Sequence, residues 1–135
     1  MIQRIQSLYL LGATIVNVAL FFSPLYRHAM RDPAGWIGIS FAVLLVAAGG
    51  LALFSIFLYS DRVRQLRWVR IGSLIQVAIL AFSAAILFTL GGFGSFLIRE
   101  LITTGLVLLA LLLYLLATRS IRKDEELVRS MDRIR

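Results

Sequence analysis

Four long apolar stretches dominate the chain, and charged residues separate them. Blocks free of Asp, Glu, Lys and Arg cover residues 5–26, 33–60, 71–98 and 101–118. A membrane-spanning helix needs roughly 20 apolar residues to cross a hydrocarbon core of about 30 Å. Each block is therefore long enough for one crossing and too short for two. The pattern predicts four membrane-spanning helices.

Proline and glycine set the ends of these helices, which we expect at about 5–23, 36–60, 68–90 and 97–118. Pro24 ends the first helix, and Pro33 to Gly35 precede the second after a short loop. The run Gly91 to Gly94 separates the third helix from the fourth and is expected to form a turn. We therefore expect an all-α membrane protein in which residues 1–118 form an up-down-up-down bundle of four transmembrane helices.

Residues 119–135 are polar and predict a short amphipathic cytoplasmic helix. Leu127, Met131 and Ile134 follow one another at i, i+4 and i+7, which places them on one apolar stripe. Such a helix either lies on an anionic lipid surface or docks on a partner protein. The acidic residues 124–126 weaken the purely lipid interpretation but do not decide between the two.

The charge distribution predicts the orientation in the membrane. The 135 residues are 60% hydrophobic and 16% charged, with a formal net charge of +7. One basic residue lies before the first apolar block, four lie in 61–70 and six follow residue 118, against three on the other side: Arg27, Arg31 and Arg99. The positive-inside rule places both termini and the 61–70 loop in the cytoplasm. Because the basic residues flank membrane spans, we do not expect nucleic-acid binding.

Few residues could carry chemistry. The chain has no cysteine and one histidine, which excludes thiolate catalysis, cysteine-ligated metals and a bis-histidine haem within one chain. His28 lies in a short loop and is expected to be solvated, without a partner. No catalytic set of residues stands out, so we expect a protein that is not an enzyme and has no cofactor or metal.

We find no ionisable residue deep in a predicted span. Arg99 and Glu100 come closest, at the outer start of the fourth span. Snorkelling at the membrane interface is the favoured interpretation of these two residues. The alternative is a gate that binds an ion or a proton, since ionisable groups inside a membrane mark functional sites.

Asn17 is the polar residue nearest the middle of the first span. At about 1.5 Å per residue, Asn17 lies about 18 Å from the inner edge of the membrane and Gln76 about 8 Å, which argues against a hydrogen bond between them. Small residues at the level of Asn17 predict a tight packing layer, with a polar substrate pocket as the alternative. This layer comprises Asn17, Gly49, Gly50, Ser83 and Gly105.

The two ends of the chain resemble a known family. The segments MIQRIQSLYLL at 1–11 and IRKDEELVRSMDRIR at 121–135 are similar to the ends of small four-span bacterial membrane proteins of unknown function, found mainly in the Bacteroidota. The resemblance implies a location in the bacterial cytoplasmic (inner) membrane. It implies no activity, substrate or cofactor.

These observations lead to two hypotheses about function. We expect a non-catalytic accessory or scaffold subunit of a larger membrane complex, in contact with other membrane-protein subunits and with anionic lipids of the inner leaflet. The alternative is a small homo-oligomeric transporter or channel, whose carboxylate would be Glu100. The expected contact residues share the predicted cytoplasmic side: Arg4, Arg62, Arg64, Arg67, Arg122, Lys123, Leu127, Arg129, Met131 and Ile134.

Overall fold

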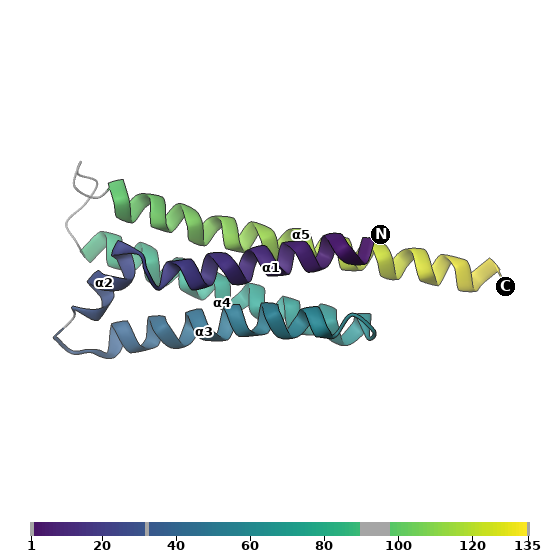
Figure 1. Ribbon diagram of the computed structural model, residues 1–135, viewed down its shortest axis with the longest axis horizontal. Helices are drawn as coiled ribbons and strands as arrows, with labels where there is room; N and C mark the ends of the chain where they lie inside the picture. The colour runs from purple at the N-terminus through teal and green to yellow at the C-terminus, as the bar shows by residue number, and fades with distance from the viewer. Residues whose placement is uncertain (1, 32, 90–97, 135) are drawn as a thin grey trace.

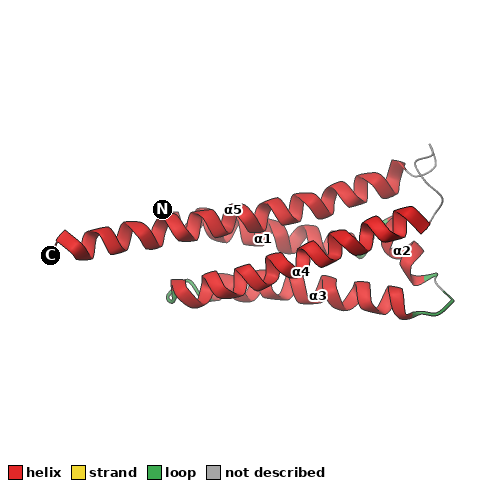
Figure 2. Ribbon diagram, turned by 180° about the vertical axis from the view of Figure 1, so that it is seen from behind, coloured by secondary structure: helices red, strands yellow, loops and turns green. Residues whose placement is uncertain are grey.

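The computed structural model describes residues 2–31, 33–89 and 98–134, with side chains from residue 5 onward, and within these ranges the chain forms helices and no strand. Four helices are long and lie side by side, and a short one lies across one end of the bundle (Figures 1 and 2). The helices are α1 (Ile2–Leu20), α2 (Pro24–Met30), α3 (Trp36–Phe57), α4 (Arg62–Thr89) and α5 (Ile98–Ile134). The predicted all-α fold is confirmed.

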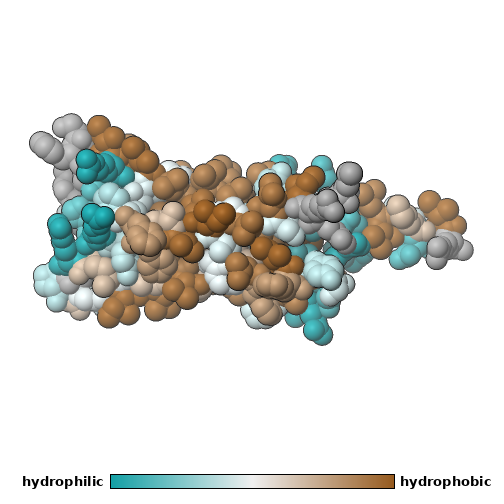
Figure 3. Space-filling model, viewed as in Figure 1, coloured by the Kyte–Doolittle hydropathy of each residue, from teal (hydrophilic) through white to brown (hydrophobic). Residues whose placement is uncertain are grey.

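Three of these helices, α3, α4 and α5, are each long and apolar enough to cross a membrane. The helices α1 and α2 meet the same criterion only as a pair, bent by 52° at the break between them, so the described residues offer up to four crossings. Brown, apolar side chains cover much of the middle of the bundle in Figure 3. Apolar residues on the outside of the bundle, such as Val46 and Leu112, are more than half exposed. An apolar exterior of this kind suits a lipid environment.

The inward faces of the long helices follow a heptad spacing. On α4 and α5 the buried positions are alternately three and four residues apart, the repeat that lets helices pack at a shallow left-handed crossing angle. Helix α1 packs against α3 and α5, and α4 packs against the same two helices. Thus α1 lies diagonally opposite α4, and α3 lies diagonally opposite α5.

The buried positions hold many polar and small residues, whereas Leu, Ile and Val are abundant on the outside. The buried polar side chains on α4 are Gln65, Gln76 and Ser83, and those on α5 include Glu100, Thr103 and Asp124. Two apolar clusters fill the remaining space, one around Phe41 and Ile79 and the other around Leu10 and Val69. The bundle is therefore apolar outside and partly polar along its axis.

Several helix ends differ from the sequence-based expectation. Helix α1 ends at Leu20, and Pro24 begins α2, where it needs no backbone hydrogen bond. The Ser23 hydroxyl caps α2 by accepting a hydrogen bond from the Tyr26 backbone N–H at 3.2 Å. Helix α3 ends at Phe57, and α4 begins at Arg62, six residues before the predicted start. The predicted turn at 91–94 lies outside the described residues.

Helix α5 is a single element from Ile98 to Ile134, so the structure shows no break between a last span and a separate tail helix at 118–119. Its C-terminal part extends beyond the rest of the bundle, as the yellow segment in Figure 1 shows. We call residues 122–134 the arm. The polar sequence that predicts a separate tail instead continues the preceding helix, because it contains neither proline nor glycine to interrupt it.

Candidate functional site

Two hydrogen bonds cross the middle of the bundle, one along each diagonal. The Asn17 Nδ2 of α1 donates to the Gln76 Oε1 of α4 at 3.2 Å. The Tyr114 hydroxyl of α5 donates to the Ala48 carbonyl of α3. The side chains of Asn17, Gln76 and Tyr114 are all buried. These bonds tie together helices that are not neighbours around the bundle.

The expectation that Asn17 and Gln76 do not meet is wrong. Asn17 is the sixteenth residue of α1 and Gln76 is the fifteenth of α4, so the two amides lie at the same height when counted from the helix starts. The sequence-based depth counted Gln76 from the apolar block that begins at Ile71. That count left out the polar first turns of α4, which pack in the bundle through Gln65 and Val69.

The predicted packing layer around Asn17 includes only part of its expected members. A Cβ added to Gly49 would lie 3.5 Å from the Asn17 Cβ, so these two residues are in contact. Ser83 is buried and donates its hydroxyl hydrogen bond to the Leu80 carbonyl of its own helix. Gly50 and Gly105 face outward, with nothing within 4 Å of an added Cβ, and therefore do not belong to the layer.

Gly72, one helical turn before Gln76 on α4, approaches its neighbour more closely than Gly49 does, and the expected layer did not include it. A Cβ added to Gly72 would lie 2.6 Å from Cε1 of the Tyr114 ring, which is shorter than any ordinary contact. The missing side chain lets the ring lie against the α4 backbone and reach Ala48. The heptad spacing Gln65, Gly72, Gln76 and Ser83 was the sequence signal for this buried face.

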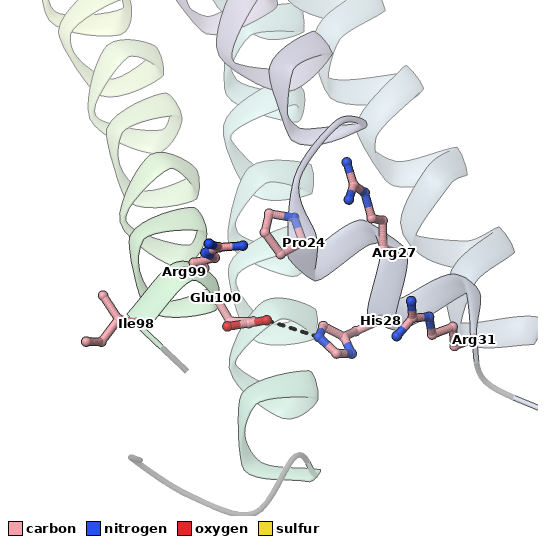
Figure 4. Close-up of a pocket in the computed structure, with 7 residues that line it drawn as sticks. All are labelled: Pro24, Arg27, His28, Arg31, Ile98, Arg99 and Glu100. Carbon is pink, nitrogen blue, oxygen red and sulfur yellow. Dashed lines mark hydrogen bonds and ion pairs between the residues drawn. The ribbon is translucent and has the colours of Figure 1, made fainter. Parts of the chain in front are cut away.

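His28 and Glu100 form a pair at the end of the bundle that carries α2 (Figure 4). The Nε2 of His28 lies 3.0 Å from Oε1 of Glu100, and Glu100 is 5% exposed. The expectation that His28 has no partner is therefore wrong, although its side chain is still 32% exposed. The residue lies in a helix rather than a loop, and α2 folds over the bundle end so that the imidazole points toward the first turn of α5. Arg99 is exposed, and Glu100 lies in the first turn of α5, where a carboxylate is favourable. The burial of Glu100 against His28 is the feature that the sequence did not indicate.

A cavity of about 620 Å³ opens beside this pair. Arg27 of α2, Arg31 at the C-cap of α2 and Arg99 of α5 line it, and all three residues are exposed. His28 and Glu100 form part of the same wall, together with Pro24 and Ile98. The three basic residues that the sequence analysis counted as flanks of different spans therefore surround one space. No sequence pattern predicts this, because α2 and α5 are far apart along the chain.

The opposite end of the bundle holds most of the expected contact residues. Leu127, Met131 and Ile134 are 47%, 65% and 86% exposed on the arm, and Arg122 and Lys123 are exposed as well. The apolar stripe predicted from the spacing therefore lies on the arm. Among the described residues, no other helix covers it. The side chain of Arg4 lies outside the described residues.

The base of the arm is joined to the start of α4 by an ion pair. The Nε of Arg62 lies 3.0 Å from Oδ2 of Asp124, and both side chains are largely buried. Arg62 and Arg129 line one groove of about 500 Å³ between α4 and the arm. Arg129 pairs with Glu125 at 2.7 Å along the arm, whereas Arg64 pairs locally with Asp61 at 3.1 Å. Arg67 is exposed.

Within residues 2–31, 33–89 and 98–134, no three His, Asp or Glu side chains gather where they could hold a metal ion. A helical bundle with an apolar exterior, a partly polar axis and three to four helices able to cross a membrane is the structure of a small helical membrane protein. The chain belongs to the family defined by the domain of unknown function DUF4293, whose profile matches residues 2–134. Searches of the curated proteins and of the solved structures found no match.

Proposed function

We propose that this protein is a non-catalytic accessory or scaffold subunit of a larger complex in the bacterial cytoplasmic membrane. In this proposal α1 with α2, α3, α4 and α5 cross the membrane in an up-down-up-down order, with both termini in the cytoplasm. The excess of basic residues at 61–70 and after residue 118 supports this orientation. The start of α1, the link between α3 and α4 and the arm lie toward one end in Figure 1, which is consistent with it.

The arm is the observation that carries the proposal. It is a continuous helix that extends past the bundle and exposes Leu127, Met131 and Ile134 along one stripe. An exposed stripe of this spacing suits docking in an apolar groove or against another amphipathic helix. The ion pair between Arg62 and Asp124 anchors the base of the arm, so the stripe is presented at a defined angle. A partner subunit that covers the stripe would bury these apolar side chains.

The basic residues beside the stripe support a second contact, with the anionic lipid of the inner leaflet. Arg122 and Lys123 are exposed where the arm leaves the bundle. Each basic residue near an anionic surface contributes roughly 1 kcal/mol of attraction. The lipid contact and the protein contact are compatible, because the base of the arm lies nearest the bundle and its tip lies furthest away.

The test compares the apolar stripe with the opposite face of the arm. The variant Leu127→Ser/Met131→Ser removes the stripe, and Glu125→Ser/Asp132→Ser changes the same number of residues on the other face. Membranes extracted with a mild detergent are run on a native gel. The wild-type protein and the Glu125/Asp132 variant should migrate in a larger complex, and the stripe variant should migrate as a lone particle. A lone wild-type particle, or a stripe variant that stays in the complex, contradicts the proposal.

The buried pair of His28 and Glu100 favours the alternative, a small homo-oligomeric transporter or channel. A buried carboxylate that faces an open cavity is the kind of group that proton-coupled transport requires. Proton flux into proteoliposomes under an imposed pH gradient distinguishes the two functions. Flux that is abolished by Glu100→Gln and retained by Glu126→Gln, on the exposed arm, would favour the transporter.

A further inference from the structure

The cavity at the α2 end has an unbalanced charge. Arg27, Arg31 and Arg99 contribute three guanidinium groups to its wall, and Glu100 is the one carboxylate among its described lining residues. That carboxylate already contacts His28 at 3.0 Å. Within the part of the chain that the structure describes, none of the three arginines forms an ion pair. The described residues of the wall therefore carry an excess of positive charge, three guanidinium groups against one carboxylate.

The geometry of the cavity arises from the way α2 is held. Gly38 of α3 lets α2 approach closely, since a Cβ there would lie 2.9 Å from the Ala29 carbonyl. The contact between His28 and Glu100 joins the other side of α2 to α5. Arg27 lies on α2, Arg31 is the C-cap residue directly after it, and Arg99 adjoins Glu100 (Figure 4). These two attachments bring guanidinium groups from two separate elements around one space.

The position of the cavity is at the edge of the apolar surface. Hydrophilic side chains gather at the α2 end in Figure 3, directly beside the brown surface of the bundle. The exposed Trp36 at the start of α3 and the exposed Ile98 at the start of α5 lie at the same end. Tryptophan is enriched at the level of lipid headgroups. The cavity therefore opens where the phosphates of a bilayer would lie.

We propose that this cavity binds a phosphate group through Arg27, Arg31 and Arg99, and that the phosphodiester headgroup of a membrane lipid is its source. Planar guanidinium groups donate paired hydrogen bonds to phosphate oxygens, which makes arginine the side chain best suited to this group. Glu100 and His28 are positioning residues, because they hold α2 against α5 and do not themselves need to touch the phosphate. The proposal is independent of the accessory function, which rests on the other end of the molecule.

The experiment measures binding to the whole purified, delipidated protein in detergent. The probes are dioctanoyl phosphatidylglycerol, dioctanoyl glycerol without a phosphate, and inorganic phosphate, and bound ligand is counted by native mass spectrometry. The test variant is Arg27→Gln/Arg31→Gln/Arg99→Gln. The matched control is Arg70→Gln/Arg119→Gln/Arg133→Gln, which removes three exposed arginines toward the other end of the molecule, none of them among the expected contact residues.

The wild-type protein and the control should bind the phospholipid equally well, and the test variant should bind it at least about tenfold more weakly. Dioctanoyl glycerol should not bind to this site. In a third outcome the wild type binds inorganic phosphate but not the lipid, and the test variant binds neither. The arginines would then form a site for free phosphate rather than for a lipid headgroup. No binding of either phosphate probe, or equal loss in both triple variants, overturns the proposal.

A further variant keeps the proposal testable where the triple variant fails to fold. Arg99→Gln alone removes one exposed side chain and leaves α2 unchanged, and it should weaken lipid binding several-fold. The variant His28→Asn tests the positioning role: it leaves all three arginines in place, so it should weaken binding less than the triple variant does. Unchanged binding in Arg99→Gln contradicts the proposed ligand set.

Discussion

The amides of Asn17 and Gln76 meet across the axis of the bundle at 3.2 Å and join α1 to the helix diagonally opposite. Asn17 also donates to the Ala13 carbonyl at 2.9 Å, and Gln76 donates to the Val107 carbonyl of α5 at 3.5 Å. The contact thus links three of the four long helices. Because apolar side chains gain little by leaving lipid for another helix, polar contacts of this kind help to specify which faces pack together.

The first prediction concerns the strength of this contact. A double-mutant cycle with Asn17→Ala and Gln76→Ala should give a coupling energy of about 1 kcal/mol, the usual size for a hydrogen bond between membrane helices. Unfolding in mixed micelles with increasing SDS measures it. Val18→Ala and Val77→Ala form the control cycle, because they are the chain neighbours of the pair and half-exposed. A coupling near zero for the amide pair would show that the two residues do not bond in the membrane.

The second prediction concerns the contact between Gly72 and the Tyr114 ring. Gly72→Ala places a methyl group 2.6 Å from that ring, so it should destabilise the protein by about 1–3 kcal/mol through overpacking. Gly105→Ala adds the same methyl group to a neighbouring helix, where nothing lies within 4 Å. It should be neutral or stabilising by up to about 1 kcal/mol, because alanine favours the helix. Both are measured by SDS unfolding, and equal effects would contradict the packing described here.

The sequence predicts the four apolar segments well and their ends less well, for a physical reason. Hydropathy reports where a helix contacts lipid, whereas the helix itself continues for as long as its backbone bonds and packing are favourable. The first two turns of α4 are polar and yet bury Gln65 and Val69 against the bundle. The arm continues α5 in the same way. Depths counted from apolar blocks consequently place Gln76 too near the membrane edge.

The candidate site was predictable only in part. The apolar stripe of the arm follows from local spacing, which a sequence shows directly. The pair of His28 and Glu100 joins residues that are 72 positions apart, and no local pattern reports such a contact. The segment expected to be a loop is the helix α2, and the bend between α1 and α2 directs this helix over the end of the bundle. This arrangement brings His28 to Glu100. The sequence around His28 does not show that bend, and it therefore gave no sign that the histidine has a partner.

The third prediction tests how α2 is held. The chain contains no cysteine, so a single Ala29→Cys substitution provides a unique reactive group at a buried position. Its reaction with a maleimide in detergent should be slow, and it should become several-fold faster when Glu100→Leu removes the partner of His28, because α2 then opens more often. Glu126→Leu, on the exposed arm, is the control. An unchanged rate in Glu100→Leu would show that the pair does not hold α2 in place.

The fourth prediction separates the two ion pairs at the start of α4. Arg62 and Asp124 have side chains that are 27% and 12% exposed, whereas Arg64 and Asp61 are 72% and 46% exposed. Removal of Arg62 leaves the Asp124 carboxylate unpaired on the buried face of α5, and a poorly solvated charge without a partner is costly. Arg62→Gln should therefore destabilise the protein by about 1–3 kcal/mol, and Arg64→Gln by less than about 1 kcal/mol.

The double variant Arg62→Gln/Asp124→Asn completes this test, because it removes both charges and replaces them with groups that can still bond. It should recover part of the stability that Arg62→Gln alone loses, since the unpaired carboxylate is then absent. SDS unfolding supplies the stability, and a spin label at Ser130 reports whether the arm moves more freely than in the wild type. Two results together would show that this ion pair does not fix the arm. They are a double variant no more stable than Arg62→Gln, and a spin-label spectrum in that double variant that is the same as in the wild type.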